Sequence, residues 1–163
     1  MSSSEIPEIL QKAILLERQG QRFYESIAEK TENSAVRRIF LAMAAEEKGH
    51  ENTLLTQYRK YTADGELSPG QVLEVPDEFS EKVLSAQVKE EIHSASYEAA
   101  AISAAMGLEQ NTVDLYTSRE KKALDDVERK LFHDLASWEE THLKFLNNLN
   151  REILQNAFFD GVE

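Results

Sequence analysis

The sequence contains one pattern twice: a glutamate followed, 30 residues later, by a Glu-x-x-His motif. Six residues make up the two copies: Glu17, Glu47, His50, Glu109, Glu139 and His142. A shift of 92 residues carries the first copy onto the second, and it also carries Phe40 onto Phe132 and Leu54 onto Leu146. An internal repeat of this kind predicts two similar structural units within one chain.

Both units have the hydrophobic spacing of packed helices. Apolar residues recur at alternating steps of four and three, which is typical of helices lying side by side in a bundle. We call this line of residues the seam; it runs from Ile6 to Ile27 and then from Val36 to Tyr61. No stretch alternates with the period of two that a strand requires. The predicted helices cover residues 5–31, 34–61, 96–123 and 126–155.

Turn-forming residues predict how the helices are connected. Asn33 or Ser34 is expected to cap the second helix, and Asp125 or Asp126 the fourth. Residues 62–79 hold two of the three prolines and two of the six glycines. We expect an all-α four-helix bundle, in which a hairpin at 5–61 and a hairpin at 96–155 are joined by a crossover at 62–95. With a tail at 156–163, residues 1–163 form a single domain in this prediction.

Composition excludes several classes of function. The net charge of −12 argues against a general nucleic-acid binder or a protein that binds anionic membranes. We expect no membrane span, because no run of about 18 apolar residues is present. The N-terminal residues do not resemble a signal peptide, which favours the cytoplasm. The absence of cysteine excludes disulfides, thiolate zinc sites and cysteine-ligated iron–sulfur clusters. Any metal must therefore be held by oxygen and nitrogen.

The six repeated residues lie on the seam, where the side chains are expected to be buried. An isolated buried carboxylate costs several kcal/mol even after relaxation, so something must compensate its charge. Residues three apart lie on one face of a helix, with Cβ atoms about 5–6 Å apart. Glu47 and His50 can therefore face one metal ion, as can Glu139 and His142. The glutamates of the first and third helices, Glu17 and Glu109, can then bridge or cap.

Four carboxylates and two imidazoles suit two divalent cations, since the charges balance. Glu and Glu-x-x-His, each present twice, is the ligand pattern of dinuclear carboxylate sites in helical bundles. These donors suit two ions of Fe or Mn, and Zn is possible in vitro. The alternative is an acidic bundle with a wet interior and no metal.

Neighbouring residues have predicted roles of their own. Tyr24 and Tyr116 lie two turns beyond Glu17 and Glu109, and we expect their hydroxyls to orient the ligand carboxylates. They could instead be ordinary core tyrosines. Glu46 does not recur at the 92-residue shift, where Trp138 stands, and is expected to face outward. Trp138 is expected to serve packing.

The chain resembles the ferritin-like di-iron carboxylate superfamily and, within it, the rubrerythrin-type domain. The first half carries the resemblance in "LERQGQRFYESIAEKT" and "AAEEKGH", and the second half in "LEQNTVDLY" and "WEETH". The resemblance implies a ferritin-like four-helix bundle with a di-iron site that reacts with peroxide or oxygen. It also implies a homodimer, with or without exchanged hairpins.

The chain departs from rubrerythrins in two respects. It has no cysteine for a rubredoxin-type iron site, so an external electron donor such as a rubredoxin-type protein is expected. Met106 also stands where rubrerythrins tend to have an extra glutamate, which brings the six-ligand set closer to ferroxidase or oxidase sites. Three hypotheses follow: a peroxidase or oxidase, a ferroxidase that handles iron, and a non-catalytic bundle stabilised by metal.

Overall fold

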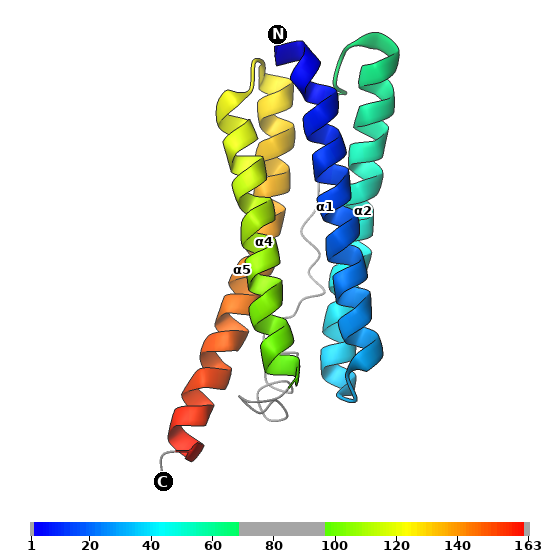
Figure 1. Ribbon diagram of the computed structural model, residues 1–163. Helices are drawn as coiled ribbons and strands as arrows, with labels where there is room; N and C mark the ends of the chain where they lie inside the picture. The colour runs from blue at the N-terminus through cyan, green and yellow to red at the C-terminus, as the bar shows by residue number, and fades with distance from the viewer. Residues whose placement is uncertain (1, 69–96, 162–163) are drawn as a thin grey trace.

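Four long helices make up the described part of the chain. The computed structural model describes residues 2–68 and 97–161, and side chains within residues 5–155 of these ranges. The helices, labelled as in Figure 1, are α1 (Ser2–Lys30), α2 (Ser34–Asp64), α4 (Tyr97–Lys122) and α5 (Asp126–Gly161). The described ranges contain no strand. The all-α prediction is confirmed, and the predicted starts of α2 and α5 match the structure.

Several predicted boundaries differ from the structure, and α1 begins at Ser2 where residue 5 was expected. The fourth helix was expected to end at 155, yet α5 continues to Gly161, so most of the expected tail at 156–163 is helical. No proline or glycine occurs between Asp126 and Gly161, and a helix can continue past the end of its buried face. The second helix also extends further, to Asp64. The rest of the expected crossover is described only to residue 68, and residues 69–96 lie outside the described ranges.

The helix ends follow from local chemistry. Asn33 has extended backbone angles, φ −83° and ψ 116°, and its Oδ1 accepts a hydrogen bond from the amide of Val36 at 2.9 Å. Asp125 does the same for the amide of Glu128 at 2.8 Å. Both satisfy an amide that has no partner within its helix. Gly65 ends α2 with a φ of 77°, a left-handed conformation that glycine adopts without steric cost.

The helices pair as two hairpins. Helix α1 packs along α2, α4 packs along α5, and α1 also contacts α4 (Figure 1). Within each hairpin the two helices run in opposite directions, because a short loop joins them.

Two apolar clusters fill the bundle, one on each side of the polar seam residues. One cluster contains Ile27, Phe40 and Ile102, and the other contains Leu10 and Phe132. In every helix, the chain passes from one cluster through the polar seam residues into the other. Burying each large side chain contributes about 1.5–3 kcal/mol. The clusters thus hold the four helices together around a polar layer and keep water from it.

Candidate metal centre

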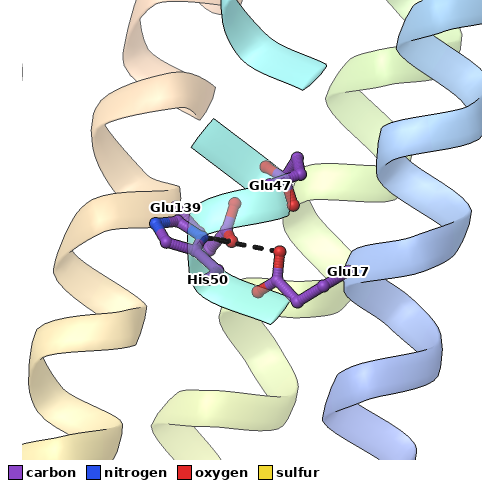
Figure 2. Close-up of side chains that lie close together, drawn as sticks. All are labelled: Glu17, Glu47, His50 and Glu139. Carbon is purple, nitrogen blue, oxygen red and sulfur yellow. Dashed lines mark hydrogen bonds and ion pairs between the residues drawn. The ribbon is translucent and has the colours of Figure 1, made fainter. Parts of the chain in front are cut away.

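All six predicted ligand residues are buried and lie together. None exposes more than 3% of its surface. They form two overlapping groups whose candidate ligand atoms lie within 4.8 Å of one another. The first group is Glu17, Glu47, His50 and Glu139, and Figure 2 shows these side chains converging from α1, α2 and α5. The second group is Glu47, Glu109, Glu139 and His142.

Glu47 and Glu139 belong to both groups. Glu17 and Glu109 each belong to one. The sequence left open whether Glu17 and Glu109 would bridge or cap. The structure places them at the two ends of the cluster and places the glutamates of the Glu-x-x-His motifs between. If two ions are bound, Glu47 and Glu139 are the residues that would contribute a carboxylate to both, and each ion would have one histidine of its own.

Both histidines present the same ring nitrogen to the carboxylates. Nδ1 of His50 lies 2.9 Å from Oε1 of Glu139 and 3.4 Å from Oε2 of Glu17. Nδ1 of His142 lies 3.3 Å from an oxygen of Glu47 and from an oxygen of Glu109. A cation held among these oxygens would meet a ring nitrogen in each group.

The two tyrosine hydroxyls each contact a carboxylate of the cluster, and both contacts cross between the hairpins. The hydroxyl of Tyr116, on α4, donates a hydrogen bond to Oε1 of Glu17, on α1, at 2.5 Å. The hydroxyl of Tyr24, on α1, donates to Oε1 of Glu109, on α4. Each tyrosine thus orients the carboxylate of the opposite hairpin. The repeat in the sequence does not reveal this exchange, because it matches equivalent positions of the two hairpins and does not say which side chains meet.

Burial and mutual repulsion make the shared carboxylates hard to ionise without a cation. Burial raises the pKa of Glu47 well above its usual value, and the nearby charges of Glu139 and Glu17 raise it further. Burial likewise raises the pKa of Glu139, with added repulsion from Glu17 and Glu109. Four carboxylates in one dry layer cannot all carry charge unless positive charge joins them.

The histidine of the first group supplies positive charge when no metal is bound. Burial alone would lower the pKa of His50, but the charge of Glu17 and the hydrogen bond to Glu139 raise it to about 9. Burial would raise the pKa of Glu17, but its hydrogen bond with Glu47 and the charge of His50 lower it to about 2. Without a metal, the raised pKa values of His50, Glu47 and Glu139 favour the protonated forms of these three side chains.

Three carboxylate oxygens of the cluster have no hydrogen-bond donor within the described residues. They are Oε2 of Glu17, Oε1 of Glu47 and Oε2 of Glu139. An unsatisfied buried polar atom costs about 1–3 kcal/mol. Divalent cations would satisfy all three oxygens, and carboxylate with imidazole is a donor set that suits Fe or Mn. The residues therefore fit a dinuclear metal centre.

Gly20 makes room for one of the shared carboxylates. A Cβ atom at Gly20 would lie 3.3 Å from Oε2 of Glu47, tighter than ordinary van der Waals contact. Gly20 lies on the seam, one turn beyond Glu17 on α1. A larger residue there would press on Glu47 and displace it.

The prediction for Glu46 was wrong. Its side chain is only 11% exposed, and its Oε2 contacts Nε2 of His142 on α5. The sequence suggested an outward position because Glu46 does not recur in the second half. It lies next to a seam residue, however, and its carboxylate reaches the histidine of the other hairpin. The prediction for Glu46 rested only on which residues recur at the 92-residue shift, and this contact involves a residue that does not recur.

Comparisons with known proteins agree with this geometry. The sequence matches the rubrerythrin family over residues 8–150. The chain belongs to the rubrerythrin family. The resemblance to the rubrerythrin-type domain seen in the sequence is therefore confirmed. Comparison with proteins of curated function gives no significant match.

A solved structure shows the same fold. It is a Thermotoga maritima protein described as a "putative ferritin-like diiron-carboxylate protein". The TM-score is 0.62 at 22% sequence identity, with 90% of this chain and 95% of that chain covered. The ferritin-like four-helix bundle is therefore confirmed. None of the helices in the described ranges is long and apolar enough to pass through a membrane.

Proposed function

We propose that this rubrerythrin-family protein is a di-iron oxidoreductase that reacts with peroxide or oxygen and is re-reduced by an external electron donor. The observation that carries the proposal is the overlap of the two ligand groups in Glu47 and Glu139. Two metal positions that share carboxylates suit reactions in which two electrons leave together. The family supports iron at both positions, although Mn or Zn would also fit these donors.

Each iron position would have one carboxylate and one imidazole of its own. Glu17 and His50 would hold one iron, Glu109 and His142 the other, and Glu47 and Glu139 would contribute to both. When bound, two ferrous ions would supply the two electrons that reduce the oxidant.

The surrounding residues would keep this geometry fixed. Tyr24 and Tyr116 hold the outer carboxylates through their hydroxyl protons. The apolar clusters on both sides, with Phe40 and Phe132 fully buried, exclude bulk water from the polar layer. A dry layer strengthens every electrostatic contact within it, so the ligands would hold their positions when the charge of the metals changes.

The electron donor must come from outside the chain. Without cysteine, the chain cannot hold the rubredoxin-type iron of full-length rubrerythrins. A rubredoxin-type protein is the donor we propose. The homodimer and the cytoplasmic location remain predictions from the sequence.

Stopped-flow spectroscopy tests the proposal. The protein loaded anaerobically with two Fe(II) is mixed with hydrogen peroxide or with oxygen, and oxidation of the iron is followed by absorbance. We expect oxidation much faster than that of free Fe(II), with the faster oxidant identifying the physiological one. The variant E47A is the control, because it removes a shared ligand. Oxidation no faster than that of free Fe(II) would refute the proposal.

A ferroxidase that handles iron is the second candidate. Met106 favours it, because this half-buried side chain packs on an apolar cluster at the position where rubrerythrins tend to have another carboxylate. Light scattering and iron loading in air distinguish this candidate. A large assembly that forms an iron mineral would support self-contained storage, whereas a dimer without mineral would argue against it.

A further inference from the structure

The two histidines of the centre differ in the contact made by Nε2, the ring nitrogen that faces away from the clustered glutamates. Nε2 of His142 contacts the carboxylate of Glu46. Nε2 of His50 is buried and has no hydrogen-bond partner within the described residues. Beside His50 stands the ring of Trp138, 5.0 Å away between centroids and inclined at 77°. The indole Nε1 of Trp138 also has no hydrogen-bond partner in the described part of the chain.

This difference breaks an otherwise repeated arrangement. The 92-residue shift relates the outer glutamates, the shared glutamates, the histidines and the tyrosines of the two hairpins. It also relates Glu46 to Trp138. Each of these two residues lies beside the histidine of the other hairpin. Equivalent positions therefore hold a carboxylate beside one metal ligand and an indole beside the other.

A carboxylate and an indole act differently on an imidazole. A carboxylate accepts the Nε2–H proton, which fixes the tautomer, leaves the Nδ1 lone pair free to bind metal and increases its basicity. An indole has a donor N–H and no acceptor nitrogen, so it cannot replace this contact. Nδ1 of His142 faces Glu47 and Glu109, which is the direction that metal binding requires.

We propose that Glu46 is a positioning residue that holds Nδ1 of His142 toward the metal and makes the His142 side the tighter of the two metal positions. The same two shared carboxylates serve both positions, and each adds one outer glutamate and one histidine. The described contacts that distinguish them are those of Glu46 with His142 and of Trp138 with His50, and only Glu46 can accept a proton from the imidazole. The inference rests on metal binding by the centre, which is part of the proposed function, but not on any redox reaction.

Anaerobic titration with Zn(II), which cannot be oxidised, measures the two binding steps by calorimetry. Wild type is expected to bind two Zn(II) with unequal affinities. The variant H50A, which keeps the His142 side, is expected to retain the tighter step and to lose the weaker one. In E46A the tighter step is expected to weaken by about 10–100-fold, while the other step stays unchanged.

Two further variants separate positioning from structural damage. E46Q keeps an oxygen that accepts the Nε2–H proton without the charge, so its tighter step should lie between wild type and E46A. E140Q removes an equivalent charge at an exposed position next to the other shared glutamate, and it should bind as wild type does. Proton NMR of the Zn(II)-loaded protein should show a downfield Nε2–H signal of His142 in wild type, which E46A lacks.

The outcomes distinguish the inference from the function on which it rests. Wild type that binds fewer than two Zn(II) would refute the dinuclear centre itself. Wild type that binds two with equal affinity, or E46A that weakens both steps equally, would refute the role of Glu46 and leave the centre intact. If circular dichroism shows that E46A does not fold, E46Q is the deciding variant, and its NMR signal is recorded as well. E46Q that binds both Zn(II) ions with the affinities of wild type would overturn the inference.

Discussion

Glu47 and Glu139 hold the centre together because each lies in both ligand groups. Replacing a shared ligand should therefore remove more metal than replacing an outer one. We expect E47A to bind no metal stably and E17A to retain one ion on the His142 side. Metal analysis after gel filtration, with Co(II) or Zn(II), counts the ions. Equal losses in the two variants would contradict the assignment of Glu47 as shared.

The pH dependence of the metal-free protein follows from His50. Its pKa rises from 6.5 to about 9 on folding, so its stabilising contribution is complete below pH 6.5 and is lost as the pH rises through 9. The raised pKa values of Glu47 and Glu139 act in the same direction, because folding favours their protonated forms.

We therefore expect the thermal midpoint of the EDTA-treated protein to decrease as the pH is raised from 6.5 to 9. The contribution of His50 has an upper limit on the order of 3 kcal/mol. Scanning calorimetry at several pH values measures the midpoint. The variant H50Q should show a flatter dependence over this range. A midpoint that rises with pH in the metal-free wild type would contradict the prediction.

Much of the clustering of these side chains could be predicted from the sequence, because the 92-residue repeat marks the six candidate ligand residues and both tyrosines. The contacts made by non-repeating residues could not be predicted. Glu46 reaches His142 only because α2 and α5 come together, and no periodicity along the chain records that distance. The same holds for the exchange of tyrosine hydroxyls between hairpins. Contacts between helices depend on their rotation and offset, which a single sequence does not specify.

At the scale of the helices, the signals that could be read from the sequence were local. Asn33 and Asp125 cap their helices as expected, because an N-cap needs only a short acceptor side chain at the right position. The end of α5 at Gly161 could not be located, because the prediction followed the buried seam and no breaker marks the end at 155.

Two glycines of α2 should respond in opposite ways to alanine. Gly65 has a φ of 77°, where a Cβ is strained, so G65A should destabilise by about 1 kcal/mol. Gly49 lies within the helix, and a Cβ atom there would meet no neighbouring side chain within 4 Å, so G49A should stabilise by about 0.5–1 kcal/mol. Urea denaturation of the metal-free variants measures both changes. A loss of stability in G49A would show that its Cβ meets an obstacle.

At the scale of the whole molecule, we expect metal binding and folding to be coupled. All four helices contribute candidate ligand residues, so an unfolded chain would have no centre to offer. A ligand that binds only the folded state at about 100 times its dissociation constant adds about 2.7 kcal/mol to the free energy of unfolding.

We expect Zn(II) at such a concentration to raise the urea midpoint by a corresponding amount. The variant E47Q, similar in shape but unable to carry the charge, should show little response to Zn(II). A wild-type midpoint that Zn(II) leaves unchanged would mean that the folded bundle does not bind the metal selectively.

The hydroxyl of Tyr24 donates a hydrogen bond to a glutamate of the other hairpin, and so does the hydroxyl of Tyr116. Two identical hairpins that associate about a twofold axis could form the same pair of hydrogen bonds without a covalent link between them. In such a pair, however, every substitution occurs twice and alters both halves alike. A single chain is free of that constraint, since each half can change alone. Glu46 beside one histidine and Trp138, at the equivalent position, beside the other is a difference that two identical hairpins could not carry.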